Sequence, residues 1–556
     1  MIYQSSYPAL NVPTDVSISQ YLLRVNPDDV SPSKVIMSDF ENPAHTLTYG
    51  ELRTRSAQAA ATLRHGHGMA EGDVVCILGQ NSVNWMLLCH SVIWGGGCFS
   101  AINALATAYE LKHYFAIAKP TIIAVDAAML PKVKEALTDS SLAVIPKIII
   151  IEDSRHNKVS DLPQFPRDFV RFQSQSLPAY DLSRRDNRTI MAGMCFSSGT
   201  SGKPKGVMLS HHNIIASMLC SRTTNPFMNN AHLREVFFPP FCHIYGMISA
   251  VMFCAYVGQY LVAMKTFDFM PYLQRCAEIR ATILRMLPSM ANRMTKEPAV
   301  RALDLTSVRI IMISGAALAP DTVRTLQAML HPDAVVLNGY GMTEGTISLL
   351  RETQAHRAGC LGRVASSTEI RIVDENMRDV PIGTEGQCLV RGPTQFMGYK
   401  DNPEETEASF LKDGHWFCTG DVVRMDEEGY LWMTGRTKEL IKFRGNQVPP
   451  AELEAVLLEH PLVADAGVCG VFDKELDTEV PMGCVTLVPE VPADERHLAL
   501  AKVRAHLDER VSPYKRLRGG LHHIDALPKG PTGKLQRRDI PAALAKSLEA
   551  KSKAKL

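Results

Sequence analysis

Short apolar runs, separated by longer segments of mixed character, recur along most of the chain. Residues 74–78 (VVCIL), 121–125 (TIIAV) and 308–313 (VRIIMI) are three of them. Runs of this length with few polar residues are typical of strands buried on both faces of a parallel sheet. The segments between them are long enough for helices, which parallel strands need as crossover connections. The pattern therefore predicts an α/β fold built on parallel sheets.

The pattern changes after residues 436–438, where we place a domain boundary. Beyond it, a helix is predicted at 450–458 and strands at 464–471 and 480–488, which together make a small α+β unit. A chain of 556 residues also exceeds one ordinary hydrophobic core. We therefore predict a large domain at 1–436 and a small domain at 437–556.

One apolar segment has nearly the length of a membrane span. No Asp, Glu, Lys or Arg occurs from residue 244 to residue 264. However, Gly246, Gly258 and Gln259 interrupt the segment, and Pro239 and Pro240 precede it. A buried helix at 251–256 and a buried strand at 259–264 fit the pattern better, so no transmembrane span is predicted.

Charge and cysteine usage narrow the class of protein. The chain has 59 Lys and Arg against 58 Asp and Glu, with no arm or face of one sign, so nucleic acid and anionic membranes are not expected partners. Its 13 cysteines are scattered and form no C-x-x-C pair, which favours reduced thiols inside a cell over disulfides or structural zinc. The N-terminus also lacks the basic and then apolar pattern of a signal peptide.

A glycine-rich segment at 197–206 (SSGTSGKPKG) is the strongest chemical signal. Hydroxyls and backbone N–H groups can surround a polyphosphate, and lysines can neutralise its charge. A strand is predicted before the segment, at 189–196, and a helix after it, beginning near Ser210 and Asn213. A strand, a glycine-rich loop and a helix in this order predict a nucleotide triphosphate site.

This loop is not a Walker loop, which has a Gly-Lys pair that begins five positions after its first glycine. Pro204 stands five positions after Gly199, and Val207 stands five after Gly202. Lys203 is followed by proline, which offers neither an N–H group nor a hydroxyl. Without further signals, a flexible surface loop with solubilising lysines is the alternative.

Further segments remove that alternative because they match one family in its order. They are 48–52 (TYGEL), 338–344 (NGYGMTE), 416–421 (WFCTGD), 435–448 (GRTKELIKFRGNQV) and 531–535 (PTGKL). With the glycine-rich loop they resemble the adenylate-forming superfamily of acyl-CoA synthetases, 4-coumarate–CoA ligases, firefly luciferase and peptide synthetase adenylation domains. The resemblance runs from about residue 3 to about residue 539.

The resemblance implies a fold and a nucleotide site. The fold would have two doubly wound α/β subdomains and a barrel-like sheet in the large domain, with a small mobile α+β domain after them. The tyrosine of 338–344 would lie against adenine, the Asp of 416–421 and Arg436 would bind ribose, and Thr343 would bind a phosphate oxygen. Without the resemblance, the tyrosine could be a core aromatic and the Asp a turn residue. The implied ATP or AMP ligands are Ser197, Ser198, Gly199, Thr200, Ser201, Gly202, Lys205, Asn338, Gly339, Tyr340, Gly341, Thr343, Asp421 and Arg436.

The chemistry of such an enzyme needs charge stabilisation more than proton transfer. A carboxylic acid with a pKa of about 4 is already ionised at neutral pH and can attack the α-phosphate of ATP without a general base. The enzyme must align the two anions and stabilise their charge. The resemblance assigns this work to Lys534, His243, Thr343 and Glu344, with Glu344 holding Mg²⁺. From its own context, Lys534 could equally be an exposed lysine near a basic terminus.

Transfer to CoA would use a second face of the small domain. The resemblance makes Lys438 the hinge about which this domain rotates. It places the pantetheine tunnel along 442–447, and the positive side chains there and nearby could meet the phosphates of CoA. The alternative for Arg444, Lys515 and Arg516 is ordinary solvated surface charge. The candidate CoA ligands are Lys442, Arg444, Gly445, Gln447 and Lys515.

The sequence indicates only the general class of the carboxylic acid substrate. The segment 241–246 (FCHIYG) resembles a His-x-Tyr-Gly segment of the coumarate ligases, in which the histidine borders the acyl pocket and the thiol tunnel. Some coumarate ligases carry a lysine near the position of Ile313, which weakens a 4-hydroxycinnamate assignment. A largely apolar pocket suits a medium-chain fatty acid or an aryl acid with fewer hydroxyls. The implied pocket residues are His243, Tyr245, Ser249, Ile313, Gly315, Ala316, Gly339, Gly345 and Thr346.

These signals predict an AMP-forming acid–CoA ligase that uses ATP, Mg²⁺ and CoA. An adenylating enzyme with a carrier protein or an amine as acceptor and a luciferase-like oxygenase are the alternatives. The last residues, Ala554, Lys555 and Leu556, resemble the Ser-Lys-Leu peroxisomal address with Ala for Ser. We therefore expect a peroxisomal import receptor as a partner and a peroxisomal location, or otherwise a cytoplasmic one.

Overall fold

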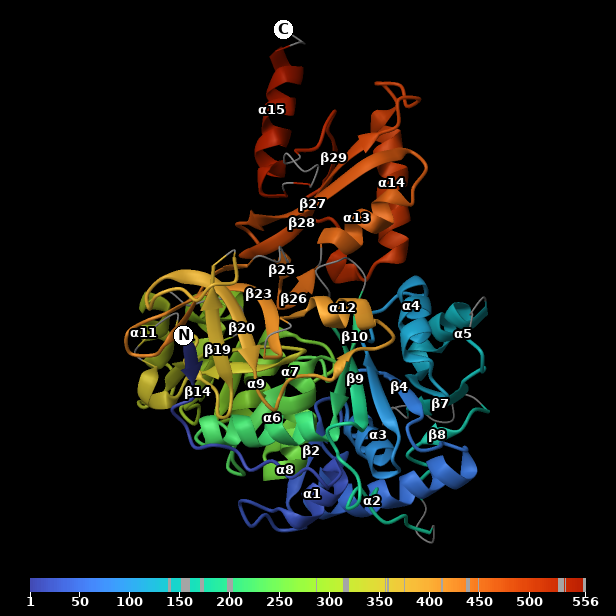
Figure 1. Cartoon of the computed structure of the whole chain (residues 1–556), viewed down its shortest axis with the longest axis vertical. Helices are drawn as coiled ribbons and strands as arrows, with labels where there is room; N and C mark the ends of the chain where they lie inside the picture. The colour runs from blue at the N-terminus through green and yellow to red at the C-terminus, as the bar shows by residue number, and fades with distance from the viewer. Residues whose placement is uncertain are drawn as a thin grey trace.

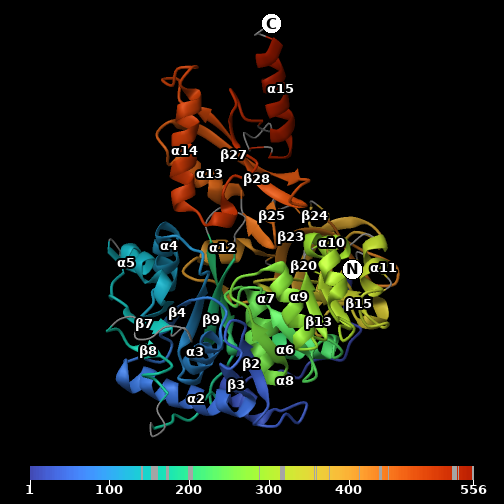
Figure 2. The ribbon, with the colours of Figure 1, turned by 180° about the vertical axis from the view of Figure 1, so that it is seen from behind.

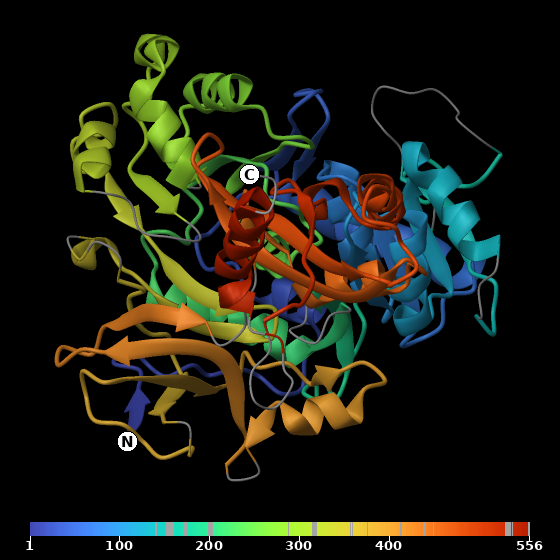
Figure 3. The same ribbon diagram turned by 90° about the horizontal axis from the view of Figure 1, so that it is seen from above.

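The computed structural model describes residues 1–138, 142–151, 161–170, 175–197, 204–286, 288–313, 320–355, 357, 360–374, 376–411, 414–436, 441–448, 450–528, 535 and 537–553. A large N-terminal domain carries a small C-terminal domain at one end (Figures 1 and 2). Seen from above, the small domain lies over the middle of the large one (Figure 3). Residues 437–440 are outside the described ranges, so the predicted position of the boundary at 436/437 stays a prediction.

The first sheet of the large domain runs in the order β21-β10-β9-β5-β4-β6-β7-β8. Pairing is parallel from β9 to β8, and β10 and β21 are added antiparallel at one edge. The strands are β21 (Gly398–Tyr399), β10 (Lys205–Ser210), β9 (Met191–Ser197), β5 (Cys98–Ile102), β4 (Val74–Leu78), β6 (Ile122–Asp126), β7 (Lys147–Ile151) and β8 (Gln164–Phe165).

Both faces of this sheet are buried, as the apolar runs predicted. Val75 and Ile77 of β4 point into the core cluster that includes α3, whereas Cys76 and Leu78 point into the cluster of α4 and α5. Alternate residues of one strand therefore pack against different helices. The helices around the sheet are α2 (Tyr49–Ala61), α3 (Val83–Trp94), α4 (Ala108–Ala118) and α5 (Leu130–Thr138).

The second α/β unit has two parallel groups of strands, β11-β12-β2 and β13-β14-β15, with β3 antiparallel at the edge of β2. Thr282, next to β13, donates its backbone N–H to the carbonyl of Arg234 in β11 at 2.8 Å, which joins the groups. The elements are β2 (Val35–Asp39), β3 (Thr46–Thr48), β11 (Arg234–Phe237), β12 (Tyr260–Ala263), β13 (Ile283–Met286), β14 (Ile310–Ile313), β15 (Val335–Leu337), α9 (Phe269–Glu278), α10 (Pro288–Lys296) and α11 (Pro320–Gln327).

Antiparallel strands complete the large domain. The sheet β1-β19-β20-β23-β22, with β24 on β23, supplies the barrel-like part, and β16-β17-β18 form a smaller sheet. The strands are β1 (Ile2–Gln4), β16 (Gly339–Met342), β17 (Gly345–Leu349), β18 (Arg363–Val364), β19 (Glu369–Val373), β20 (Glu385–Arg391), β22 (Phe410–Leu411), β23 (Trp416–Met425) and β24 (Leu431–Arg436).

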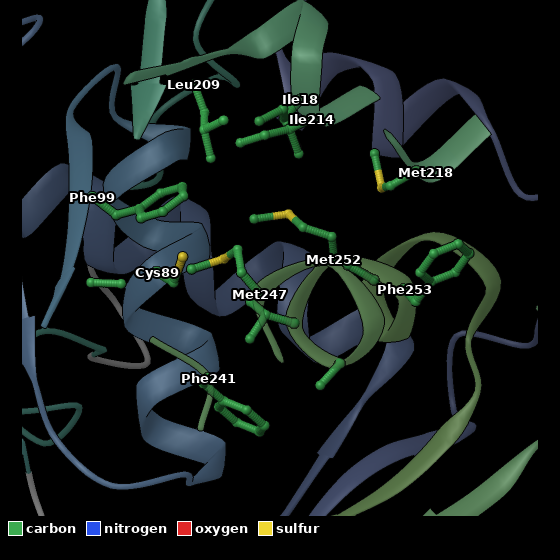
Figure 4. Packing of buried hydrophobic residues seen from close by; sticks show 14 of the residues in the cluster. Ile18, Cys89, Phe99, Leu209, Ile214, Met218, Phe241, Met247, Met252 and Phe253 are labelled. Carbon is green, nitrogen blue, oxygen red and sulfur yellow. The ribbon is translucent and has the colours of Figure 1, made fainter. Parts of the chain in front are cut away.

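The main core lies where the first sheet meets the central helices (Figure 4). Phe99 of β5 and Leu209 of β10 face Ile214 and Met218 of α6 and the methionines of the segment Met247–Met252. These side chains are all buried. The remaining helices of the large domain are α1 (Ile18–Arg24), α6 (His211–Thr224), α7 (Ile244–Gly246), α8 (Phe253–Val257) and α12 (Pro403–Ala408).

The apolar segment 244–264 belongs to this core. It forms α7, the π-helical turn Met247–Met252, α8 and then β12, so the predicted helix followed by a strand is confirmed. Gly258 ends α8 in a left-handed conformation, with φ of 67°. In the described ranges of the chain, every helix falls short of the length and apolar character that crossing a membrane requires.

The small domain confirms the predicted helix and strands almost residue for residue. Its antiparallel pair β27–β28 takes β29 as a parallel neighbour, and β25 and β26 form a separate hairpin. The elements are β25 (Ile441–Phe443), β26 (Asn446–Val448), α13 (Pro450–Leu458), β27 (Val463–Asp473), β28 (Thr478–Leu487), α14 (Arg496–Arg510), β29 (Leu521–His523) and α15 (Ile540–Lys553).

One sequence-based expectation is wrong. The glycine-rich loop does not lead directly into a helix, because the strand β10 lies between them and pairs antiparallel with β9. The predicted helix start is correct: the Ser210 hydroxyl accepts from the Asn213 N–H, and the Asn213 side chain accepts from the Ser210 N–H. The loop therefore cannot present the N-terminus of α6 to a phosphate.

Candidate active site

The two ends of the glycine-rich loop are held by the β9–β10 hairpin. Ser197 and Lys205 face each other across the pair, and residues 198–203 between them lie outside the described ranges. The predicted ligands Ser198, Gly199, Thr200, Ser201 and Gly202 are among these. The Ser197 hydroxyl oxygen is buried and has no hydrogen-bond partner in the described part of the chain. A buried hydroxyl without a partner is costly unless a ligand satisfies it, so its position fits phosphate binding.

Lys205 already has a partner. Its ammonium forms an ion pair with Glu405 of α12 and lies 4.9 Å from the centre of the Tyr399 ring. Only 8% of Lys205 is exposed. A phosphate would have to share or displace this carboxylate, so the predicted role of Lys205 in nucleotide binding stays a prediction.

Thr343 and Glu344 form the turn between β16 and β17, and both are buried. A Glu344 oxygen accepts a hydrogen bond from the Tyr399 hydroxyl at 2.9 Å, and the Glu344 carbonyl accepts from the Phe396 N–H at 3.0 Å. Tyr399 belongs to β21, which pairs with β10. This chain of contacts holds the turn beside the hairpin of the glycine-rich loop.

Tyr340 and Asp421 are brought together from segments 81 residues apart. The Tyr340 hydroxyl donates to an Asp421 oxygen at 2.6 Å, and both side chains are buried. Burial, and after it the nearby Cys388 and Asp421, raise the pKa of Tyr340 well above its usual value, so the phenol stays a donor. Arg436 pairs with Asp421 across β23 and β24, which places its backbone beside the predicted ribose ligand.

The neighbours of these residues are glycines and a short amide. The Asn338 side-chain oxygen accepts from the backbone N–H of Gly339 at 2.8 Å. A Cβ at Gly339 would lie 2.9 Å from a Leu349 methyl, so this position favours glycine. Gly341 pairs with Thr346 next to a register shift in the β16–β17 hairpin. The sequence segment 338–346 is therefore one tight hairpin, with the predicted Mg²⁺ ligand at its turn.

His243 caps the short helix α7, and its Nδ1 accepts from the Tyr245 N–H at 3.3 Å. Its ring is accessible to solvent, yet desolvation by the surrounding protein lowers the pKa of the imidazole. A neutral ring with an acceptor at Nδ1 carries its proton on Nε2. His243 can therefore donate a hydrogen bond at neutral pH.

A buried ion pair lies behind Tyr245. Arg285 of β13 is paired with Glu235 of β11 through its Nε at 2.6 Å, and its Nη1 donates to the Tyr245 hydroxyl. The Arg285 guanidinium also lies 5.0 Å from the centre of the Phe237 ring. The apolar pattern of these strands did not predict a charge pair here, and Tyr245 is held in place by it.

Other predicted pocket residues have mixed surroundings. Ile313 is 2% exposed at the end of β14 and belongs to the core of the second α/β unit. The carbonyl of Ser249 accepts from the Gln259 amide at 2.8 Å. Gly345 and Thr346 begin β17, where the Thr346 N–H donates to the Thr394 hydroxyl at 3.2 Å. Gly315 and Ala316 lie outside the described ranges.

The predicted CoA segment is a two-residue hairpin in the small domain. Lys442 and Gln447 are paired across β25 and β26, and Arg444 and Gly445 form the turn with φ of 45° and 81°. Positive φ at both turn positions matches the twist of the strands and favours glycine at the second. Lys442 and Arg444 are exposed, as a contact with phosphates requires.

Lys515 is not the exposed residue that the sequence indicated. It is 3% exposed and lies between the carboxylates of Glu110 and Glu452, so in this orientation it cannot contact CoA. Arg516, next to it, is exposed. Lys438 and Lys534, the predicted hinge and catalytic lysine, lie outside the described ranges.

Sequence reasoning missed Tyr399, Glu405, Glu235 and Arg285. Tyr399 follows Gly398, whose φ is 131°. The sequence shows that this residue is a glycine but not which backbone conformation it adopts. Glu235 and Arg285 lie in apolar strands and Glu405 lies in a short acidic helix, and a single sequence does not show which charge meets which. Only the folded chain brings them together.

No group of three or more His, Cys, Asp and Glu suited to a metal is found in the ranges that the structure describes. Mg²⁺ does not need such a group, because it is commonly held by one or two carboxylates together with substrate phosphates and water. The role of Glu344 as its ligand stays a prediction.

The family model described as AMP-binding enzyme matches residues 27–400, and the model of the AMP-binding enzyme C-terminal domain matches residues 452–534. The chain belongs to the AMP-binding enzyme family. The resemblance to the adenylate-forming superfamily is thereby confirmed.

Curated members of the family are similar over nearly their whole length. A 4-coumarate–CoA ligase of Narcissus pseudonarcissus is 29% identical over 98% of this chain and 96% of its own. A probable 4-coumarate–CoA ligase of Dictyostelium discoideum is 31% identical over 84% of this chain and 85% of its own.

Solved structures of the family share the fold. An o-succinylbenzoate CoA synthetase of Bacillus subtilis superposes with a TM-score of 0.77, 23% identity, and coverage of 95% of this chain and 99% of its own. An amide bond synthetase of Marinactinospora thermotolerans gives a TM-score of 0.75 and 22% identity with the same coverage of both chains. The predicted fold class is confirmed.

The Tyr340–Asp421 contact gives a first prediction. Tyr340→Phe keeps the ring but removes a donor from a buried carboxylate, so the free energy of unfolding should fall by about 1–3 kcal/mol. The KM for ATP should also rise, because the predicted ribose ligand loses its support. Denaturant unfolding and steady-state kinetics measure the two effects.

Tyr3→Phe is the matched control, because the Tyr3 hydroxyl is buried without a hydrogen-bond partner in the described part of the chain. Its loss should leave stability within about 0.5 kcal/mol of the parent. Equal unfolding curves for the two variants would contradict the assigned importance of the Tyr340–Asp421 bond.

Proposed function

We propose that this protein is an AMP-forming carboxylic acid–CoA ligase. The near-full-length similarity to acid–CoA ligases is the observation that carries this conclusion, and it confirms the class of enzyme expected from the motifs. ATP and CoA are then substrates together with a small carboxylic acid. The Tyr340–Asp421 and Tyr399–Glu344 hydrogen bonds support the proposal because they bring nucleotide and metal candidates from distant segments together.

The reaction would proceed in two steps. An oxygen of the carboxylate attacks the α-phosphorus of ATP, and the bond to pyrophosphate breaks, which gives an acyl adenylate. The CoA thiolate then attacks the acyl carbon, and the C–O bond to AMP breaks. Asp421 and Tyr340 would hold the nucleoside, while the hydroxyl of Ser197 and the loop after it would bind phosphate oxygens.

Magnesium is part of the proposal. Mg²⁺ would neutralise charge on the phosphates of ATP, and Glu344 is the carboxylate proposed to hold it. The hydrogen bond from Tyr399 occupies one Glu344 oxygen and fixes the carboxylate within the turn.

For the acid, we propose an aryl or medium-chain fatty acid that lies along His243 and Tyr245. Neutral His243 can donate to a carboxylate oxygen through Nε2. The Tyr245 ring is kept in place by Arg285, so it offers a fixed wall rather than one that adapts to many shapes. These assignments rest on the resemblance of segment 241–246 to the coumarate ligases.

The experiment that tests the function uses purified protein, ATP, Mg²⁺ and a pool of fatty, cinnamic, benzoic and phenylacetic acids, with and without CoA. Mass spectrometry should detect acyl-CoA only when CoA is present, and the acid that is consumed names the substrate class. Acyl-AMP that accumulates without any acyl-CoA would overturn the proposal and point to a carrier protein or an amine as acceptor.

Lys534 is the residue proposed to bridge the acid and the α-phosphate. Lys534→Ala should lower the rate of adenylate formation about 10²–10³-fold, the usual effect of removing one donor of this kind. Lys546→Ala changes an exposed lysine of α15 and is the control. Pyrophosphate release measures both, and unchanged release by the Lys534 variant would sink the assignment.

A peroxisomal location is also proposed, through Ala554, Lys555 and Leu556. A fluorescent reporter that carries residues 547–556 should collect in peroxisomes of a suitable cell. The same reporter without its last three residues should stay diffuse. If both reporters are diffuse, the tripeptide is not an import signal.

A further inference from the structure

Lys515 lies in the small domain, in the turn after α14, and is almost fully buried. Its ammonium contacts Glu452 of the same domain at 2.7 Å and Glu110 of the large domain at 2.9 Å. Both carboxylates are buried as well, at 6% and 7% exposure. Although burial acts to lower it, the phenols and carboxylates around Lys515 raise the pKa of its ammonium well above the usual value. The cation is thus shared across the domain junction.

The large-domain side of this contact is the first turn of α4. Glu110 completes a capping box there, because it accepts from the Thr107 N–H at 2.9 Å and its own N–H donates to the Thr107 hydroxyl. The Ser512 hydroxyl of the small domain donates to the second Glu110 oxygen at 2.7 Å. The Glu110 carboxylate therefore caps its own helix and also binds Ser512 and Lys515 of the small domain.

Two further contacts join the same surfaces. The Thr107 hydroxyl donates to the Arg510 carbonyl at 3.0 Å, and the Tyr109 hydroxyl donates to Glu459 at 2.6 Å. We call Glu110, Ser512, Lys515 and Glu452, which are all buried, the junction cluster. Because the Tyr109–Glu459 contact is exposed and the Thr107–Arg510 contact is only partly buried, the junction cluster should contribute most of the attraction.

The junction cluster is connected to the candidate active site on the large-domain side. In α4, the His113 ring contacts the Pro204 carbonyl at 2.9 Å, at the end of the glycine-rich loop, and Tyr114 packs on Phe196 with ring centres 4.5 Å apart. The cluster is therefore linked through α4 to the end of the glycine-rich loop.

The orientation that the cluster holds has a definite consequence. In both side views, β25 and β26 lie on the face of the small domain that is turned toward the large domain, whereas α15 lies on the far side (Figures 1 and 2). Leu535, just before α15, packs beside Gly467 of β27, in the cluster with Ile540 of α15. The domain contact therefore presents the hairpin of the CoA candidates.

We propose that Lys515 is a positioning residue for the transfer of the acyl group to CoA. It acts through the buried ion pair with Glu110, which holds the small domain with the 441–448 hairpin at the site. This inference rests on the proposed function, since it assigns the contact to the second step of that reaction. The resemblance assigns adenylate formation to another face of the small domain, so this step should not depend on the ion pair.

Glu110→Gln tests this with little disturbance of either domain. Glutamine can keep the capping box, and Lys515 keeps Glu452 as its charge partner. The loss of one buried, charged contact should slow acyl transfer from preformed acyl-AMP to CoA about tenfold or more. The rate of pyrophosphate release in the first step should stay within about twofold of the parent, within the usual scatter of a neutral change. Single-turnover kinetics separate the two steps.

The matched control is Glu51→Gln. Glu51 forms the same capping box with Thr48 at the start of α2 but makes no hydrogen bond or ion pair with the described residues of the small domain. It should leave both steps unchanged. Transfer rates that match between Glu110→Gln and Glu51→Gln would overturn the proposal, and so would an equal loss in both steps of Glu110→Gln.

A second variant keeps the test decisive if Glu110→Gln folds poorly. The double change Lys515→Met with Glu452→Gln removes the cation and its small-domain partner together, so no unpaired charge is left within that domain. It should again slow transfer and spare adenylate formation. A parent protein that forms acyl-AMP but never acyl-CoA would refute the proposed function. If the parent transfers the acyl group normally and the variant does so equally well, the role of Lys515 is refuted instead.

Discussion

The antiparallel edge of the first sheet is the constraint on which the candidate site depends. There β10 pairs with β9 on one side and with β21 on the other, so Ser197 and Lys205 at the ends of the glycine-rich loop are held in one register with Tyr399. Tyr399 then holds Glu344 at the turn of a different hairpin. A shift of one residue in β21 would turn Tyr399 away from Glu344, because alternate residues of a strand face opposite sides. Backbone pairing thus sets the distance between the ends of the glycine-rich loop and Glu344, the proposed metal ligand.

Buried ion pairs are a second constraint on the positions of groups in this molecule. Arg285 with Glu235, and Lys515 with its two carboxylates, lie where apolar packing would be simpler and often as stable. Such pairs are directional, and here each fixes a group at the site. Arg285 fixes the Tyr245 ring, and Lys515 fixes the face of the small domain. A charge pair at a junction can also separate into water, which a domain that presents two faces requires.

Much of the fold was predictable from local patterns. The apolar runs gave the parallel strands, and Ser210 with Asn213 gave the start of α6, because both signals are complete within a few residues. The motifs gave the family. The strand β10 was missed because its partner lies across the loop. The burial of Lys515 was missed because Glu110 is 405 residues away in sequence, and spacing along a chain does not reveal such contacts.

The most direct test of the proposed acyl adenylate is to label the oxygen atoms of the acid. The acid that the protein activates is supplied with both carboxylate oxygens replaced by ¹⁸O, together with ATP, Mg²⁺ and CoA, and the AMP and pyrophosphate are analysed by mass spectrometry. Attack of the carboxylate on the α-phosphorus predicts one ¹⁸O atom in AMP, one in the thioester and none in pyrophosphate. Unlabelled AMP, or label in a phosphate that comes from the β- or γ-position, would contradict an acyl adenylate and with it the central claim.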